Sequence, residues 1–184
     1  IPGFPVRLEG EDVTLLIEQY RDQLPLNREI MTMDPPDHTR HRALMMRQFT
    51  PKRVAETEDA MAGLADAEID RFIGRGSCNL IDDFAAPYAL MNICSLLGVP
   101  DEDLEEFRVE MLGEHRDRGL GSVKEKMGLD PFAFLRERFT RYIEARRAEP
   151  RGDVMTRMAE ALFADGSIPE VEDVVHLASD LFIG

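Results

Sequence analysis

The chain has 184 residues, which is enough for one substantial domain or for a large part of a bigger one. Its formal net charge of −14 argues against a general nucleic-acid-binding protein, because neutralising phosphates requires a basic surface. A hydrophobic content of 43% with 32% charged residues is ordinary for a globular protein and excludes a wholly disordered chain.

The two cysteines, Cys78 and Cys94, are far apart in the sequence, which excludes a disulfide scaffold and a zinc knuckle. No apolar run approaches the ~20 residues that span a bilayer. No basic stretch followed by an apolar one marks a signal peptide. We therefore expect a cytoplasmic protein that binds neither a membrane nor nucleic acid.

Hydrophobic periodicity predicts an almost wholly helical first half. The Pro35-Pro36 pair cannot sit inside a helix, but it fits just before one or in its first turn. Thr50 is a good helix N-cap and Pro51 suits a first helical position, so a new helix begins there. The apolar run FAAPYALMNICSLL is typical of a buried central helix. We predict helices over 11–21, 38–49, 51–73 and 84–97, and one short strand over 78–81.

The second half has the same helical character. Gly98 and Pro100 end the central helix, and the glycine-rich, charged residues 113–130 predict a mobile connection. Pro169 opens a last helix whose apolar stripe continues to Gly184. Because the chain starts without Met and stops inside that helix, we expect a piece of a longer protein. We predict helices over 101–112, 131–148, 153–163 and from 169 onward.

The most informative segment, residues 36–54, concentrates positive charge in an acidic chain. His38 and Arg42 are four residues apart, so they project from one helix face about one turn from each other. With the unpaired N–H groups and partial positive charge of the helix N-terminus, they form a clamp suited to a pair of carboxylates. The alternative is a solvated basic face. From 38 to 53 there is no Asp or Glu, and the other basic residues are Arg40, His41, Arg47, Lys52 and Arg53.

The clamp face also carries apolar side chains, because Met45 and Phe49 continue the same stripe. A large flat molecule with carboxylates at one edge fits this combination of charge and hydrocarbon. The remaining basic residues do not all share that face. They either attract an acidic protein partner, which affects association rate more than affinity, or only keep the surface soluble.

Two blocks, MDPPDHTRHR at 33–42 and FTPKRV at 49–54, resemble the signature around the third named helix of bacterial cytochrome P450 haem-thiolate monooxygenases. The shorter runs LGVP, PRGDV and HLASDLFIG occur in the family's order, so the resemblance covers essentially the whole chain. It implies a mainly α, P450-type helical fold with at most short strands. Residues 1–184 would then be part of a single domain that is truncated at both ends.

The resemblance also implies a haem b cofactor whose propionates are held by His38 and Arg42, with Phe49 and Gly184 nearby. A small apolar substrate and O2 would bind beneath a roof formed by residues 112–134. An electron-transfer protein, commonly an acidic ferredoxin in bacterial members, would dock on the basic face. The implied substrate-pocket residues are Leu26, Ile30 and Met31, and the implied docking residues are Arg40, Arg47, Lys52 and Arg53.

The family's iron ligand is a Cys in a Phe- and Gly-rich loop, a context that neither Cys78 nor Cys94 has. Both are therefore predicted to be structural. No catalytic residue or metal ligand is assigned within the sequence, and we expect these 184 residues alone to be inactive. The longer protein would hydroxylate an apolar small molecule with O2 and two electrons. The alternative is a non-catalytic, all-helical binding or scaffold module.

Two other features of the histidines say less about function. The His38-x-x-His41 spacing differs from the H-E-x-x-H pattern of helical zinc sites, so we do not expect a metal there. His176 lies on the last predicted helix, and we expect it in solvent or at the edge of the core.

Overall fold

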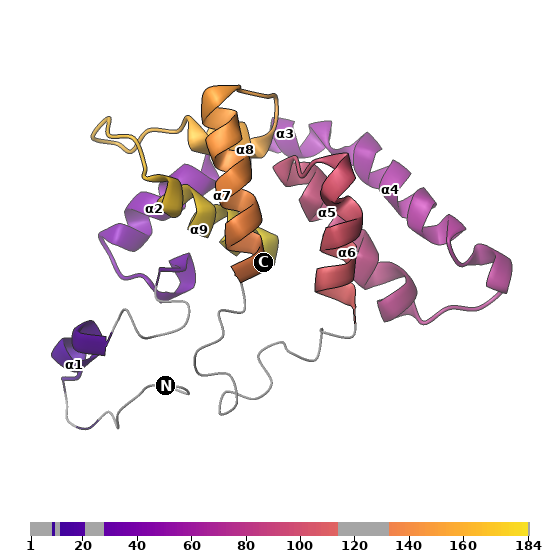
Figure 1. The fold of residues 1–184 in the computed structure, drawn as a ribbon, viewed down its shortest axis with the longest axis horizontal. Coiled ribbons are helices and arrows are strands. Elements are labelled where there is room, and N and C mark those ends of the chain that lie inside the picture. The colour runs from indigo at the N-terminus through magenta and orange to yellow at the C-terminus, as the bar shows by residue number, and fades with distance from the viewer. Residues whose placement is uncertain (1–8, 10–11, 21–27, 114–132, 184) are drawn as a thin grey trace.

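The structure is a computed structural model that describes residues 9, 12–20, 28–113 and 133–183. Within these ranges the regular structure is helical and includes no strand, so the predicted mainly α fold class is confirmed. Short 3-10 turns are η2 (Ile30–Thr32), η3 (Ile73–Arg75) and η5 (Asp101–Asp103), and η4 (Leu80–Ala85) is a π-helical turn. The α-helices in Figure 1 are α1 (Thr14–Tyr20), α2 (Asp37–Met46), α3 (Pro51–Glu56), α4 (Glu58–Asp70), α5 (Ala86–Leu97), α6 (Leu104–Leu112), α7 (Ala133–Ala148), α8 (Val154–Ala159) and α9 (Val171–Ile183).

The predicted helix over 51–73 is two helices, because the chain is interrupted at Thr57. The Thr57 hydroxyl donates a hydrogen bond of 2.7 Å to the Val54 carbonyl, and the Thr57 amide bonds the same carbonyl at 3.1 Å. Such local bonds compete with the regular helical ladder. The result is that α3 ends at Glu56 and α4 starts at Glu58.

The predicted strand over 78–81 is wrong. Asn79 Oδ1 accepts hydrogen bonds from the amides of Ile81 and Asp82, and the Asn79 amide donates to Asp83 Oδ2. This arrangement caps a helical turn that begins at Leu80 and leads directly into α5. Local capping therefore decides the conformation, although the apolar pair at 80–81 suits a strand as well.

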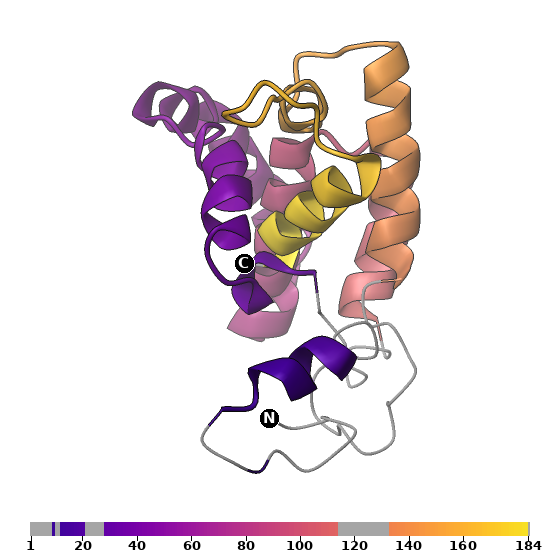
Figure 2. The same ribbon diagram turned by 90° about the vertical axis from the view of Figure 1, so that its left-hand side faces the viewer.

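The core forms where α5, α7, α8 and α9 pack together. In Figure 2, α9 lies between α2 and α7, and it contacts both helices. Three aromatic rings from α6, α7 and α9 meet near the C-terminal end of α9. The Phe107 and Phe182 centroids are 5.5 Å apart, and the Phe139 and Phe182 centroids are 5.8 Å apart. α9 is thus a central element, and seven consecutive residues from Val174 to Asp180 are buried.

Two of the sequence motifs meet in space. Gly98 of the LGVP run ends α5 in the left-handed region (φ +82°), and its amide closes the helix on Cys94 and Ser95. The Arg146 guanidinium, 2% exposed, donates to both the Gly98 carbonyl and the carboxylate of Asp153 in the PRGDV run. This contact joins the ends of α5, α7 and the start of α8.

The helical stretch Leu80–Leu97 is long and apolar enough to cross a membrane by length and composition, which the sequence prediction overlooked. No other described helix passes that test. Its α5 part packs on α4, α6, α8 and α9, and buries Leu90, Met91, Cys94 and Leu97. Although 28% of the whole stretch is buried, the face of α5 that packs on these four helices belongs to the core.

Candidate functional site: the two flanks of helix α2

Helix α2 presents three different sides, which the 100° step between successive residues separates. Leu44, 2% exposed, and Gln48, just past the helix, face the core. His41 lies on the same side, where its Nδ1 donates to the Asp37 carbonyl at 2.9 Å and its ring packs edge-on against Phe163. His41 is therefore engaged in packing rather than available to an external ligand.

His38 and Arg42 lie on one flank of α2, as their spacing predicts. The His38 side chain is half-buried and Arg42 is exposed. Among the described residues, neither side chain has a hydrogen-bond or ion-pair partner. Met45, on the same flank, is partly buried and packs against the core. The flank thus combines two unengaged cationic or donor groups with an apolar base.

The opposite flank is engaged with the rest of the protein. Arg40 donates to Ser167 Oγ at 2.8 Å, lies 3.3 Å from Asp165 Oδ2, and stacks on the Phe163 ring at 3.7 Å. Arg47 donates to the Leu162 carbonyl at 2.9 Å. These contacts hold the α8–α9 loop on α2. The charges of both arginines remain exposed at the surface.

The other two predicted docking residues lie at α3. Arg53 donates to the Arg47 carbonyl at 2.6 Å and approaches Gln48 Oε1 at 3.5 Å. Lys52 is 85% exposed and lies 3.9 Å from Glu56, one turn along the helix. Arg157 of α8 also reaches Gln48 Oε1, at 3.2 Å, which extends the basic surface to a residue that the sequence interpretation did not include.

The remaining predicted site residues are spread over three places. Phe49 is half-buried and lines an apolar groove of about 830 Å³ with residues of α3, α4 and α5. Ile30 is partly buried in η2 and packs against the core, whereas Met31 is 64% exposed. Leu26 and Gly184 lie outside the described residues, as does most of the predicted roof.

The two cysteines differ in environment. Cys94 is fully buried in α5, and burial raises the pKa of its thiol to about 12, despite the opposing charge of Arg108. A thiol with that pKa stays protonated near neutral pH and is a poor metal ligand. Cys78 is exposed before η4. These environments support a structural role for Cys94.

A haem fits the flank of α2 that carries His38 and Arg42. Propionates need donors that are not already used by the protein, and these two side chains meet that requirement. The porphyrin body needs an apolar surface beside them, which Met45 begins. The partnered arginines on the other flank do not meet the same requirement.

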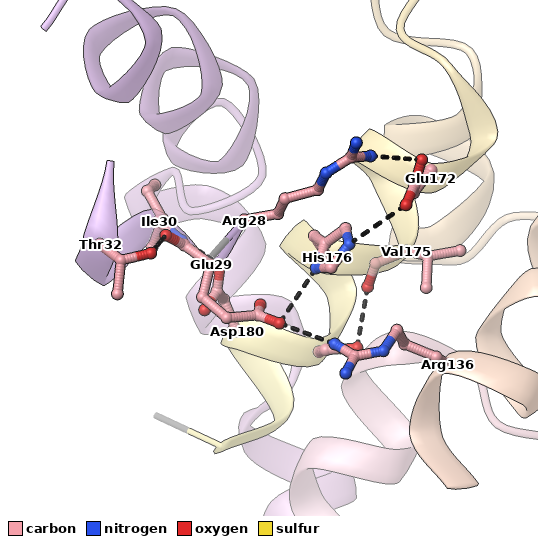
Figure 3. Close-up of polar contacts among 10 residues, drawn as sticks. Arg28, Glu29, Ile30, Thr32, Arg136, Glu172, Val175, His176 and Asp180 are labelled. Atoms are coloured by element: carbon pink, nitrogen blue, oxygen red, sulfur yellow. Dashed lines mark hydrogen bonds and ion pairs between the residues drawn. The ribbon is translucent and has the colours of Figure 1, made fainter. Parts of the chain in front are cut away.

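A buried polar cluster beside α9 was not foreseen from the sequence. Glu29, 1% exposed, accepts hydrogen bonds at Oε1 from His176 Nδ1 at 3.0 Å and from Arg136 Nη1 at 2.9 Å (Figure 3). Asp180 Oδ2 accepts from the Ile30 amide at 2.8 Å. His176 is 7% exposed, so its expected position at the core edge or in solvent is wrong. The available signal was a His and an Asp four residues apart in a strongly apolar helix.

No protein-family model matches the chain. Among curated proteins, it is 33% identical over 137 residues to cytochrome P450 109 of Bacillus spizizenii, covering 72% of this chain and 34% of that protein. It is 34% identical over 139 residues to cytochrome P450 107B1 of Saccharopolyspora erythraea, covering 74% and 33%.

Solved structures agree with the curated proteins. The substrate-free cytochrome P450 CYP150A6 of Mycobacterium marinum is 40% identical, with a TM-score of 0.80 over 100% of this chain and 41% of that one. The chain therefore spans between about a third and two fifths of the length of these relatives. Identity and fold together show that the chain belongs to the cytochrome P450 family and represents part of that fold.

Proposed function

We propose that the protein of which this chain is part is a haem-dependent monooxygenase that hydroxylates a small apolar molecule with O2 and two electrons. The observation that carries the proposal is the unpartnered pair His38 and Arg42 on one flank of α2, in a chain of the P450 family. When bound, the haem supplies the oxygen-activating iron chemistry, through a Cys thiolate that this sequence does not contain.

The residues of this chain have binding and positioning roles in that proposal. His38 and Arg42 would donate hydrogen bonds to the propionates and so orient the cofactor. Ile30 and Met31 would form part of the wall of the substrate pocket. Relatives named vitamin D(3) 25-hydroxylase and steroid C26-monooxygenase support an apolar substrate, since both names describe largely hydrocarbon molecules.

The test replaces His38 and Arg42 together by Ala in the full-length protein. Each charge-assisted hydrogen bond contributes ~1.5–3 kcal/mol, so loss of both should weaken haem binding by a factor on the order of 100 to 10,000. Haem affinity is measured by the Soret absorbance during transfer to a haem acceptor. The matched control is Arg40→Ala with Arg47→Ala, on the opposite flank of the same helix, which should retain haem. Equal haem loss from both double variants would contradict the assignment.

The activity itself is tested on the unaltered full-length protein. A haem-thiolate enzyme is red and shows the Soret shift of thiolate ligation when it is reduced under carbon monoxide. A colourless protein that folds and does not take up haem would instead be the binding or scaffold module considered above.

The electron donor is proposed to be an acidic protein, such as a ferredoxin, that docks near Lys52. Arg47 is exposed there, and Arg53 and Arg157 are half-buried; all three also make internal hydrogen bonds. A surface of this kind steers association and is sensitive to salt. Lys52→Glu should lower the rate of electron transfer at low salt, and the difference should shrink as salt is raised. The cytoplasmic location remains part of this proposal.

A further inference from the structure

The cluster beside α9 joins three elements that are far apart in the sequence. Glu29 comes from the segment before η2, Arg136 from α7, and His176 and Asp180 from successive turns of α9 (Figure 3). The Glu29 side chain is 1% exposed and Asp180 is 9% exposed. Since η2 contains Ile30 and Met31, the cluster fixes the proposed wall of the substrate pocket to α9.

The cluster has too few donors for its oxygens. Glu29 Oε1 has two donors, but Glu29 Oε2 is fully buried and receives no hydrogen bond from a fixed donor of the described chain. Asp180 uses Oδ2 for the Ile30 amide. If both carboxyls were ionised, the Arg136 guanidinium would be the one permanent cation among the described residues that faces them. An isolated carboxylate in such surroundings is costly, and neutralisation is the usual outcome.

Other charged groups around the cluster do not remove this imbalance. Glu172, on the outer turn of α9, adds negative charge 3.9 Å from His176 Nε2, and Arg28 neutralises it at 2.5 Å. His176 already donates its Nδ1–H to Glu29. Burial first, and then the neighbouring Glu29, raise the pKa of Asp180 from 3.8 to about 6, while the Ile30 amide opposes that rise.

We propose that Glu29 and Asp180 share one buried proton, and that this pair is a positioning latch that holds the η2 wall of the substrate pocket on α9. The proton resides on Asp180 and is donated to Glu29 Oε2, while Asp180 Oδ2 keeps the Ile30 amide. Loss of the proton leaves two carboxylates and one permanent cation, so the segment 28–32 opens more often. The role in substrate positioning depends on the monooxygenase proposal, whereas the latch itself does not.

The Ile30 amide reports directly on the latch, because its hydrogen bond to Asp180 must break before it exchanges with solvent. We would measure its deuterium uptake in the full-length protein, supplied with haem and corrected for intrinsic exchange, at several pH values. An aspartate with pKa 3.8 when open and about 6 when closed makes opening on the order of tenfold more frequent at pH 7 than at pH 5. The opening frequency should be flat above about pH 7.

Variants separate this latch from simple packing. Asp180→Asn is a permanent mimic of the protonated form, so Ile30 should stay protected and lose its pH dependence. Asp180→Ala should expose Ile30 at every pH. The matched control Asp66→Asn, on the exposed side of α4, should keep the wild-type profile. His176→Asn should also keep a pH-dependent profile, because the proton is assigned to Asp180.

Two results would overturn the latch: a wild-type Ile30 protection that is independent of pH from 5 to 7, or an Asp180→Asn variant that still follows pH. In the second case, a pH dependence that is also lost in His176→Asn would place the proton on the histidine. Haem loading is recorded on the same samples. Failure of haem binding with an intact exchange profile would reject the monooxygenase and leave the latch standing.

Discussion

Two of the buried charge clusters among the described residues, around Arg146 and around Glu29, join distant elements but differ in their balance of charge. Around Arg146, one guanidinium faces one carboxylate, Asp153, and a carbonyl, that of Gly98. Around Glu29, two carboxyls face one guanidinium and an imidazole. The balanced cluster ties α5, α7 and α8 together within the core, whereas the unbalanced one ties the proposed pocket wall to α9. The cluster around Arg146 and the proposed latch thus differ by one carboxyl group.

The pKa values of the aspartates in the two clusters are shifted in opposite directions. Burial alone would raise the pKa of Asp153, but hydrogen bonds from Thr156 and the ion pair with Arg146 outweigh it and lower the pKa below 3.8. For Asp180, burial and Glu29 prevail and raise the pKa to about 6. Near pH 5 the same amino acid is therefore ionised in one cluster and mostly protonated in the other.

The largest effect should come from breaking the balanced cluster with Arg146→Met. The change keeps the buried volume but leaves the Asp153 carboxylate and the Gly98 carbonyl without their donor. We expect the free energy of unfolding to fall by about 3–5 kcal/mol, as for other buried pairs that lose one partner. Urea unfolding of the full-length protein measures it. Arg141 lies on the same helix as Arg146 and forms an exposed ion pair with Asp103. Arg141→Met should therefore lower the free energy of unfolding by less than about 1 kcal/mol. Similar losses in both variants would contradict the comparison.

A smaller effect should come from crowding the same cluster with Gly98→Ala. A Cβ at Gly98 would lie 2.5 Å from Asp153 Cβ, and the residue has φ +82°. Gly166 has nearly the same backbone, φ +83°, but open space around it. Gly166→Ala should therefore cost about 1 kcal/mol from backbone strain alone. Gly98→Ala should cost at least about 1 kcal/mol more, because Asp153 must move. Equal melting temperatures for the two variants would show that Asp153 adapts freely.

The smallest effect should be a gain in stability from Asp180→Asn. Because the folded-state pKa of Asp180 is raised, its stabilising contribution is complete below pH 3.8 and is lost as the pH rises to about 6. The neutral amide avoids that loss, so the variant should gain about 1 kcal/mol at pH 7, a figure discounted for solvent screening, and nothing near pH 4. Asp153→Asn should instead lose stability at pH 7, because the lowered pKa of Asp153 means that its carboxylate stabilises the fold above pH 3.8. Urea unfolding of both variants at pH 4 and at pH 7 measures these opposite effects.

Local sequence signals predicted much of the helical order correctly. Pro35 and Pro36 precede a helix that begins at Asp37, and Thr50 caps one that begins at Pro51, with its Oγ accepting from the Arg53 amide at 3.3 Å. The strand predicted over 78–81 is wrong, because the Asn79 side chain caps a π-helical turn that begins at Leu80. Short apolar runs are compatible with either structure, and the local hydrogen bonds decide between them.

The spacing of His38 and Arg42 sufficed to place them together on one flank of α2, because helix geometry alone determines that arrangement. The spacing did not reveal which basic side chains would form hydrogen bonds and ion pairs within the protein. Arg40 is held by Asp165, Ser167 and Phe163, more than 120 residues away along the chain. Only the fold brings that loop onto α2. As a result, Arg40 has internal partners, whereas His38 and Arg42 have none among the described residues.

The sequence by itself determined the helical class, the P450 resemblance and the spacing that puts His38 and Arg42 on one helix face, since each depends on residues that are near neighbours in the chain. The tertiary structure alone decided the two charge clusters. Glu29 and His176 are 147 residues apart, and Ile30 and Asp180 are 150 apart. Whether a buried carboxyl keeps or releases its proton depends on the charges that folding places around it, and no local pattern encodes those neighbours.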